Sequence, residues 1–451
     1  MRTPLLIAVA FLGTVPGDLA AQITDLRTAL RRAESAAYAN RMAAGRADAE
    51  AGSASAALRG FLPTVRLEGG YVGTNEPLSA FGSLLRQRGV TPEAFEPPRL
   101  NYPDNIGNVA AATILEQPLI NADAWFGRRA ALSAAGAARA SAEWERSGTA
   151  VNVVRGWYGA ILAREVTTAL DTAFASARAH QRQAESMYRN ELVTRSDALL
   201  AAVRAGEVEA RLLAAQGEAD LARTRLALAI GVPPDSVSPP GAELPPAAAL
   251  RAFVAADTLA TDGGERADVR AARLAASAAS LDARRATAAL LPRVNAFGRL
   301  DWNSAAAPFG GGESWTAGIM VSWTPFSGGA ELAERRAAGG RRAAAAAASD
   351  AAVAQGALEL EAAETAVRVA LARMDIAERG VVQSVEAHRI VARKYAGGVA
   401  TVTDLFDAAA AETAARLAFA EARYQLIIAA AERRRASGRD IVALASLEET
   451  E

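Results

Sequence analysis

The chain has 451 residues, enough for two or three ordinary domains or one very elongated one. A formal net charge of −1 gives no basic field that would attract nucleic acid. The absence of cysteine excludes thiolate metal sites, thiol catalysis, disulfides and a lipid anchor on an N-terminal cysteine. His180 and His388 are the only histidines, which leaves little for a histidine-based metal site or catalytic triad. Because the sequence also has no phosphate loop, no metal-ligand cluster and no nucleophile–histidine–acid set, we expect no enzyme, no metal site and no other cofactor.

Residues 1–21 are typical of a secretory signal peptide. One arginine precedes the apolar run from Leu5 to Val15, and Pro16 and small residues follow it. The run is too short to span a bilayer, and no stretch of about 18 uninterrupted apolar residues occurs elsewhere. We therefore expect export with cleavage near Ala21, so that any membrane must be crossed by strands. The alternative is a buried N-terminal helix.

The first half predicts the order helix, strand, loop, strand, helix, helix. These elements are expected at about 24–60, 61–73, 74–108, 109–119, 122–189 and 194–230. The first strand alternates between an apolar and a polar set, which are Val65, Leu67 and Tyr71 against Thr64, Arg66 and Glu68. The proline- and glycine-containing loop at 74–108 is expected to be irregular and exposed.

The second half repeats this plan. Pro118 and Pro325 each close a strand-like run and lie 207 residues apart, and Asp197 and Asp404 have the same separation. Such a fixed spacing indicates a duplication. We expect the first structural repeat at 22–230 (strand-loop-strand 61–119, helical hairpin 122–230) and the second at 265–438 (strand-loop-strand 291–326, helical hairpin 328–438). Between them, 231–264 is expected to be a proline-rich linker or a small equatorial domain, and 439–451 a C-terminal tail.

The four strands predict a membrane barrel that several chains share. Lipid outside and water inside would produce their alternation, although Phe297 and Glu116 are expected on the wrong faces. An open sheet edge in hydrocarbon leaves backbone groups unpaired, so one chain cannot close such a barrel. Two chains would give eight strands with a filled interior, whereas three would give twelve and an open channel. We therefore expect a trimer.

The helices are unusually long. From Gly328 to Tyr395 there is no proline, and ~68 residues at ~1.5 Å each reach roughly 100 Å. Two heptad series follow this segment, two residues apart: Val367, Leu371, Met374, Val381 and Val385, and then Val369, Ile376 and Ile390. Two seams indicate neighbours on both sides, as in the wall of a helical tube. A simple bundle with a diffuse apolar face is the alternative.

Over essentially the whole mature chain, these features resemble the TolC-like outer-membrane efflux proteins. The resemblance rests on strand-loop-strand units opened by "LP" and closed by "QPL" and "TPFSGG", on "ERADVRAA" (265–272), and on the tip segments "YRNELVTRSDALLAA" (188–202) and "KYAGGVATVTDLFDAA" (394–409). It implies a mainly α fold with a transmembrane β part. Three chains would complete a twelve-stranded β-barrel in the outer membrane of a Gram-negative cell, above a long antiparallel α-helical barrel in the periplasm.

The resemblance also implies a function. A homotrimer of this family is the passive exit duct of a tripartite efflux system for small molecules, and it docks on a periplasmic adaptor protein and an inner-membrane transporter. The alternative is the outer-membrane duct of a type I protein secretion system, which shares every feature above and differs in its pump. A coiled-coil stalk of the cell envelope would leave the four two-faced strands unexplained.

The tip segments carry the gate that the resemblance implies. Asp404 and Asp407 match the two acidic residues that ring the closed periplasmic entrance, where three copies of each would favour cations. Tyr395 and Asp197 are expected to hydrogen-bond between neighbouring hairpins and to help keep the entrance shut. An arginine of the family would fall at Ala400, so that lock is missing or is replaced by Arg195.

The residues also allow structural roles at the same positions. Asp197 and Asp404 lie just past predicted turns, where an aspartate caps a helix by accepting hydrogen bonds from its free amides. Asp407 lies inside the helix and has no such role. His180 and His388 are expected at the surface of helices before the tips, rather than as metal ligands.

Overall fold

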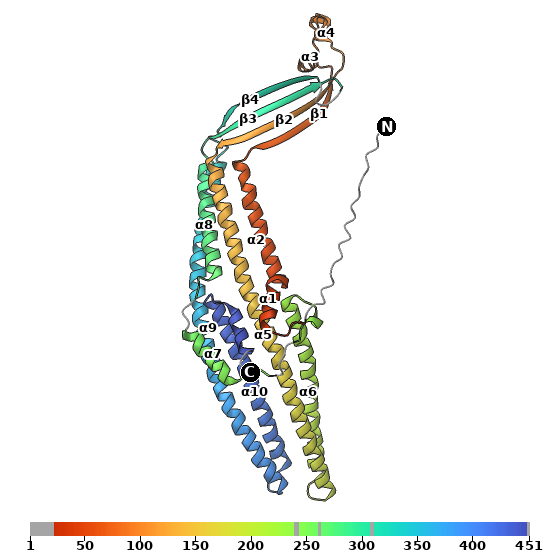
Figure 1. Ribbon diagram of the computed structural model, residues 1–451, viewed down its shortest axis with the longest axis vertical. Helices are drawn as coiled ribbons and strands as arrows, with labels where there is room; N and C mark the ends of the chain where they lie inside the picture. The colour runs from red at the N-terminus through yellow and green to blue at the C-terminus, as the bar shows by residue number, and fades with distance from the viewer. Residues whose placement is uncertain (1–21, 239–242, 260–262, 307–310, 449–451) are drawn as a thin grey trace, which may run out of the picture. The chain divides into compact units, whose positions relative to one another are not determined.

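The computed structural model describes residues 22–238, 243–259, 263–306 and 311–448 (Figure 1). The expected signal peptide, residues 1–21, lies outside the described residues. Within those ranges, no helix is both long and apolar enough to cross a membrane. The fold is mainly helical with one four-stranded antiparallel sheet, which confirms the fold class predicted from the sequence.

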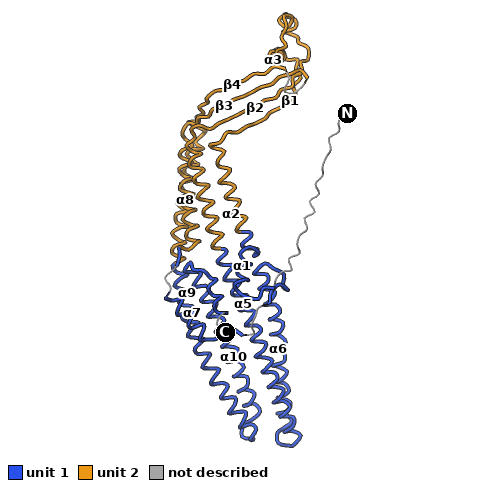
Figure 2. The backbone as a smooth tube through the Cα atoms, viewed as in Figure 1, with its two compact units in different colours: residues 1–42, 145–264, 357–451 blue, residues 43–144, 265–356 orange. Residues whose placement is uncertain are grey.

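Contacts divide the chain into two compact units, and each unit draws on both sequence halves (Figure 2). The hairpin unit comprises Met1–Met42, Glu145–Gly264 and Ala357–Glu451, and the sheet unit comprises Ala43–Trp144 and Glu265–Gly356. The two long helices, α5 (Ala122–Arg189) and α9 (Ala330–Ala396), begin in the sheet unit and end in the hairpin unit. The predicted sequence repeats stay a prediction, because contacts group residues by proximity and not by ancestry.

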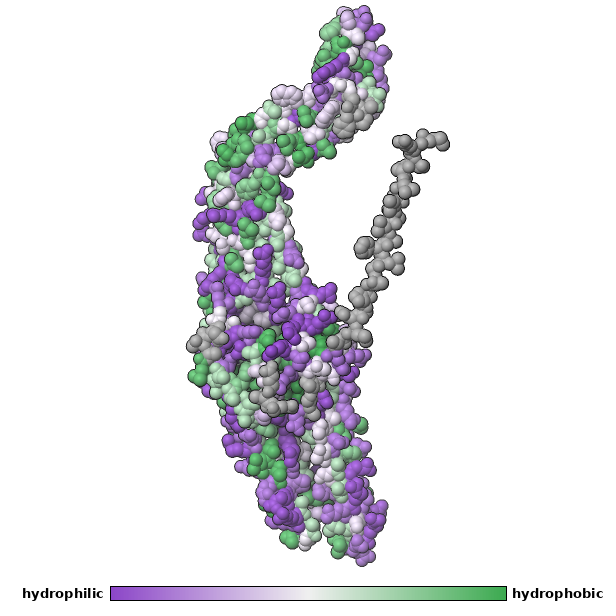
Figure 3. Space-filling view, in the orientation of Figure 1, coloured by the Kyte–Doolittle hydropathy of each residue, from purple (hydrophilic) through white to green (hydrophobic). Residues whose placement is uncertain are grey.

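The sheet has the order β1-β2-β3-β4, with β1 at Thr64–Thr74, β2 at Ile106–Ile120, β3 at Arg293–Ser304 and β4 at Gly312–Ser322. Its register gathers polar side chains on one face, among them Arg66, Glu68, Glu116, Asn295, Arg299, Asp301 and Thr316. The opposite face is apolar and exposed, with Val65, Leu67, Tyr71, Leu115, Leu300, Trp315, Ile319 and Val321. Apolar side chains are visible over the strands in Figure 3.

The register corrects one prediction about these faces. Glu116 pairs with Phe297 on the polar face, where its Oε1 accepts a hydrogen bond from Asn295 Nδ2 at 3.0 Å. The expectation that Glu116 faces lipid is wrong, because the alanines at 110–112 carry no polar signal that would fix the alternation. Phe297 does lie on the polar face as expected. A Cβ at Gly318 would come within 3.1 Å of its ring, so this glycine makes room for it.

The loop between β1 and β2 is more ordered than predicted. It contains α3 (Pro77–Arg86), a 3-10 turn η2 (Pro92–Phe95) and α4 (Pro97–Asn101). The prolines start these helices instead of breaking structure, because proline suits the first helical position, where no amide partner is needed. The Glu76 carboxylate caps α3 by accepting from the backbone N–H of Ser79 at 2.6 Å.

Small side chains let the helices of the sheet unit approach closely. Ala43 and Ala47 of α2 (Tyr38–Ala56) pack on Ala142 of α5. Arg266, within the "ERADVRAA" segment, precedes α8 (Ala267–Ala288) and forms an ion pair with Asp268 at 2.8 Å. Its guanidinium also donates to the Gly356 carbonyl oxygen at 3.2 Å and stacks on a tryptophan ring. This motif therefore ties α8 to the long helices.

The predicted helix at 24–60 is interrupted at Ala37. Helix α1 ends at Ala36, and Ala37 N still donates to the Ala33 carbonyl oxygen at 3.1 Å. The buried Asn40 side chain donates to the same oxygen at 2.9 Å and so holds the chain at the break. Gly231, which ends α6 (Arg195–Ile230) with φ +84°, lies against this break. A Cβ there would lie 2.3 Å from the Ala36 carbonyl oxygen, so only glycine fits.

The core of the hairpin unit includes segments that were assigned from the sequence to a linker and a tail. Helix α7 (Ala247–Leu259) follows the proline-rich stretch, and the 3-10 segment η4 (Ile441–Glu448) lies in the expected tail. Leu444 of η4 and Trp157 of α5 are fully buried in the same cluster. The Glu448 carboxylate accepts from Trp157 Nε1 at 2.5 Å and from the Leu26 N–H, which begins α1, at 2.9 Å.

The two apolar seams of α9 have different surroundings. Val367 and Met374 are buried in the core of the hairpin unit. On the flanking seam Val369, Ile376 and Ile390 are exposed, Ile376 by 61%. Helix α6 likewise carries exposed aliphatic side chains, which are Leu199, Val203, Leu213, Leu221 and Leu228. Within the described residues, each of these helices therefore has an apolar surface that the chain itself does not cover.

Candidate functional site

In each helical hairpin, the second helix begins at the tip with the same local structure. Thr194 caps α6, and Thr401 caps α10 (Val402–Ala436). In the first box the Asp197 carboxylate accepts from Thr194 N at 3.0 Å, while Thr194 Oγ1 accepts from Asp197 N at 3.2 Å. Sequence reasoning weighed capping as one role of this aspartate, and the geometry places it in a reciprocal capping box.

Asp404 makes the same box on α10. Its carboxylate accepts from Thr401 N at 2.9 Å and from Thr401 Oγ1 at 2.7 Å. These hydrogen bonds, the side-chain one first, hold the pKa of Asp404 below its usual value. The carboxylate is therefore charged and exposed at the start of α10, where it also meets the positive end of the helix dipole.

Asp407, one turn further along α10, borders a cavity of about 700 Å³ between the hairpins. Arg204 of α6 lines the same cavity and forms an ion pair with Glu207 at 2.9 Å. The pKa of Arg204 is raised first by Glu207 and also by the negative charge of Asp407. Asp407 thus lies within electrostatic reach of a cation on the other hairpin of the same chain.

Tyr395 lies in an apolar cluster that joins both hairpins. With 2% of its surface exposed, it packs with Val402, Leu405 and Phe406 of α10 and with Ala184 and Ala201 of the other hairpin. Its buried hydroxyl has no hydrogen-bond partner among the described residues. Burial, and then the negative charge of Asp197, raise the pKa of Tyr395. The predicted pair is therefore close in space but is not hydrogen-bonded within one chain.

Arg195, the predicted substitute lock, is the first residue of α6. It is exposed, and it forms no ion pair within the described ranges. The structure therefore brings Asp197 near Tyr395, and Asp407 near a cation of the other hairpin, but it leaves Arg195 facing solvent. The expected ring of Asp404 and Asp407 would need further copies of the chain.

The two histidines are not the surface residues that the sequence predicted. His180 of α5 and His388 of α9 lie edge to face, with ring centroids 5.9 Å apart, and the Phe406 ring lies 6.0 Å from His180. His388 Nδ1 lies 2.7 Å from Glu412 Oε2, and its buried Nε2 has no partner among the described residues. Sequence reasoning missed this contact, although the two positions are 208 residues apart, one step from the repeat spacing.

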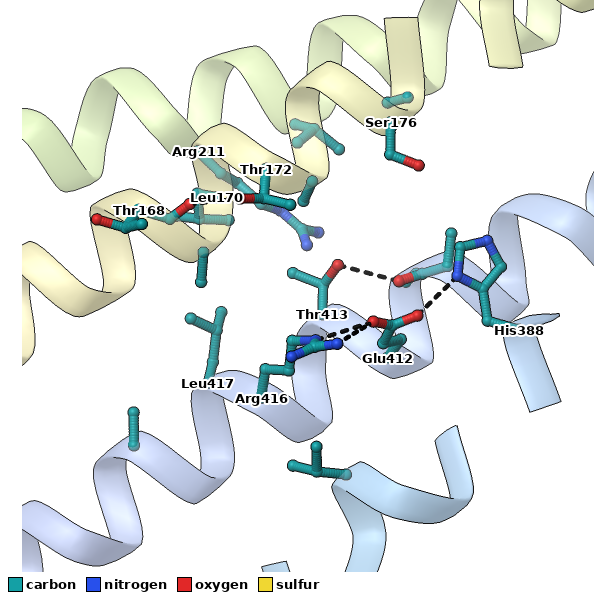
Figure 4. A pocket seen from close by; sticks show the side chains of 18 of the residues that line it. Thr168, Leu170, Thr172, Ser176, Arg211, His388, Glu412, Thr413, Arg416 and Leu417 are labelled. Atoms are coloured by element: carbon teal, nitrogen blue, oxygen red, sulfur yellow. Dashed lines mark hydrogen bonds and ion pairs between the residues drawn. The ribbon is translucent and has the colours of Figure 1, made fainter. Parts of the chain in front are cut away.

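Figure 4 shows Glu412 of α10 between His388 and Arg416. One carboxylate oxygen faces His388, and the other accepts from Arg416 Nε at 2.8 Å. Burial raises the pKa of Glu412, but the hydrogen bonds from His388 and then Arg416 outweigh it and lower the pKa overall. Burial, and then the neighbouring His388, lower the pKa of His180. No group of three or more potential metal ligands occurs among the described residues.

Comparison with solved structures identifies the fold. It is similar to the outer membrane protein VceC from Vibrio cholerae at 20% identity and a TM-score of 0.75, with 92% of this chain and 96% of that one covered. The Campylobacter jejuni CmeC outer membrane channel matches at 15% identity and a TM-score of 0.76, covering 97% and 94%. The Neisseria gonorrhoeae MtrE outer membrane channel matches at 18% and 0.69, covering 93% and 91%. The fold is thus that of outer-membrane channels.

The sequence adds the family. Residues 264–439 match the family model described as outer membrane efflux protein. No curated protein matches the sequence of the chain. The second half of the chain is therefore similar to outer membrane efflux proteins, and the resemblance predicted from the sequence is confirmed.

Proposed function

We propose that three copies of this chain form the passive outer-membrane exit duct of a tripartite efflux system for small molecules. The sheet carries this proposal. Its exposed face is apolar and its other face is polar, and β1 and β4 each pair on one side only in the described part of the chain. In lipid, unpaired strand edges are too costly to persist, so closure by other copies satisfies the backbone. Three copies give twelve strands and a water-filled interior.

The exposed seams of α6 and α9 support the same assembly. Each is an aliphatic stripe on a helix whose other side is already packed within the hairpin unit. A second copy of the chain can cover both stripes, because in a ring of identical protomers α6 of one protomer packs against α9 of the next at every interface. Ile376 and Leu213, exposed by 61% and 63%, would be covered there.

At the entrance, the three-fold ring would bring together three Asp404 and three Asp407 carboxylates. Asp404 is the better placed of the two, because it is exposed at the tip and its capping box keeps the carboxylate charged. Such a ring attracts and holds cations. Tyr395 and Asp197 would then help to keep the closed state, because the negative charge of Asp197 acts on the buried Tyr395 hydroxyl, which has no hydrogen-bond partner among the described residues.

The duct has no catalytic role in this proposal, and its energy comes from partners. A periplasmic adaptor and an inner-membrane transporter supply substrate, so the chain would span from the outer membrane into the periplasm. The paired helical hairpins, with identical capping boxes at their tips, offer the surface on which an adaptor docks. The identity of the transporter separates small-molecule efflux from protein secretion.

Planar-bilayer recording of the purified chain tests the proposal. We expect a small cation-selective conductance from a trimer. Asp404→Asn with Asp407→Asn removes both charges, and the change at Asp404 keeps an acceptor for the cap of α10, so selectivity for cations should fall while the trimer stays intact. If the channels keep the same cation selectivity, the two aspartates do not form the gate, but the proposal of a duct still stands. A folded trimer that forms no channels would contradict the duct itself.

A further inference from the structure

The β1–β2 loop does not project freely from the end of the sheet. Helix α3 lies against β2, β3 and β4, and its buried face carries Ala80, which is fully buried, and Ser83, which is 8% exposed. Gln87, the C-cap residue, follows one turn later and contacts β2. The opposite side of the helix is exposed, including Leu78 at 80%. Within the loop, the Phe81 and Phe95 rings pack edge to face with centroids 5.4 Å apart, so α3 and η2 form a small structure of their own.

The two buried strand side chains beside α3 belong to the polar face. Gln87 Nε2 donates to the backbone carbonyl oxygen of Gly107 at 2.8 Å and to Asn108 Oδ1 of β2 at 2.9 Å. Asn108 Nδ2 in turn donates to Asn303 Oδ1 of β3 at 2.9 Å. Both asparagines are buried, at 4% and 5% exposure. By the register, they lie on the same face as Arg299 and Asp301. The loop therefore covers the loop end of the polar face and leaves the apolar face open.

The contact extends across the sheet to β4, the strand furthest from β1. A Cβ at Gly312 would lie 2.2 Å from the Arg86 carbonyl oxygen, so the loop backbone occupies the space of a side chain on the polar face. Arg88 Nη2 donates to the Glu313 carbonyl oxygen at 2.7 Å. Arg88 also has φ +55°, a conformation that costs about 1–2 kcal/mol for a residue with a Cβ and persists only where surroundings hold it.

We propose that this loop is a cap that folds over the lumen side of the barrel and narrows its outer mouth. The inference rests on the proposed function, because the polar face is the lumen only in a closed barrel. In a trimer three such caps would surround the opening, each anchored across β2, β3 and β4 by the contacts above. The duct would then have two constrictions, the acidic entrance at the hairpin tips and this external one, which admits small solutes and excludes large ones.

The chain has no cysteine, so a single introduced thiol reports on one position. Thr316→Cys places it on the polar face of β4, four residues beyond Gly312. Intact cells are treated with a small thiosulfonate and with a large polyethylene-glycol maleimide, which reaches the lumen only through the outer mouth. We expect the small reagent to react and the large one to be slower by an order of magnitude. Adding Gln87→Ala and Arg88→Ala, which remove both anchors, should largely abolish that difference.

Two controls separate the cap from the duct. Gly70→Ala places a Cβ on the polar face where nothing lies within 4 Å, and should leave the reagent ratio unchanged. Ile319→Cys lies on the apolar face and should react with neither reagent, because lipid covers it. If Ile319→Cys labels as readily as Thr316→Cys, the barrel is wrong, and the cap with it. If Ile319→Cys is protected but the large reagent reaches Thr316→Cys freely in the unaltered loop, the cap alone is overturned.

Discussion

His388 Nδ1 lies 2.7 Å from Glu412 Oε2, and this contact ties α9 to α10 at the level where His180 of the other hairpin meets the same imidazole. The pair of rings therefore lies across the boundary between the two hairpins. Around it are the carboxylates of Glu412 and Asp407 and the guanidinium groups of Arg204 and Arg416, which line the adjoining cavity. We therefore expect the charge of this cluster to affect how stably the two hairpins pack together.

Acidification should loosen the hairpin unit through His180. Its pKa in the packed state lies below 6.5, so packed hairpins resist the proton that separated hairpins accept. Stability is then complete above about pH 6.5, where His180 is neutral in both states, and falls as pH drops from there toward the lowered pKa. In thermal unfolding, the wild type should lose more Tm than His180→Gln between pH 8 and pH 5.

The pH range in which His180 affects stability is distinct from that of Glu412, because the lowered pKa of Glu412 affects stability only below about pH 4.5. A measurement that stops at pH 5 therefore reports on the histidine. If His180→Gln and the wild type lose the same Tm over that range, the contact between the rings has no role in stability.

Substitutions at two nearby residues of α9 should distinguish effects on folding from effects on trimer assembly. Met374 is fully buried within the chain, and Met374→Ala should cost about 2–5 kcal/mol of unfolding free energy. Ile376 lies two residues away on the exposed seam, so Ile376→Ser should leave the unfolding of the isolated chain nearly unchanged but weaken the trimer. Sedimentation in detergent measures the trimer fraction. If the Ile376→Ser variant remains fully trimeric even on dilution, this seam does not contribute to the trimer interface.

Much of the fold could be predicted because its signals are local or periodic. The proline-free runs predicted the bounds of α5, α6, α9 and α10 nearly to the residue. The alternation of polar and apolar residues predicted three of the four strands. The alanines in β2 and the prolines of the β1–β2 loop misled, because a small side chain has no polarity to alternate and proline can start a helix as well as prevent one. The packing of η4 against Trp157 depends on contacts between residues 291 apart, which no local pattern encodes.

The site was predicted less completely for the same reason. The capping boxes follow from four adjacent residues, so their chemistry is readable from Thr194 and Thr401 alone. The histidine contact requires two helices to meet in one register. The repeat spacing places His180 and His388 one residue from equivalence, but it does not say that equivalent positions touch. Likewise, Tyr188 and Tyr395 share the spacing, yet one is 42% exposed and the other 2%.

Gly231 should be intolerant of any side chain. Its φ of +84° costs an alanine about 1–2 kcal/mol, and the new Cβ would in addition press on the Ala36 carbonyl oxygen at the break between α1 and α2. Gly231→Ala should therefore lower the stability of the hairpin unit by more than the cost of the positive φ alone. Gly45→Ala is the matched control, since nothing lies within 4 Å of a Cβ in that helix, and it should stabilise by about 0.5–1 kcal/mol. Chemical denaturation compares the two, and equal effects would contradict the close approach at Ala36.

Thr401 and Asp404 allow capping and charge to be measured apart. Thr401→Ala removes the hydroxyl that caps α10 and should cost about 1 kcal/mol, as should Thr194→Ala at the equivalent tip. Thr401→Ala also removes the largest influence that lowers the pKa of Asp404, so that pKa should rise toward its usual value. The carboxylate is still charged at neutral pH, so the cation selectivity of the channel should survive Thr401→Ala there and fall in Asp404→Asn. Selectivity lost equally in both variants would mean that the shape of the tip, and not the charge of Asp404, selects the ion.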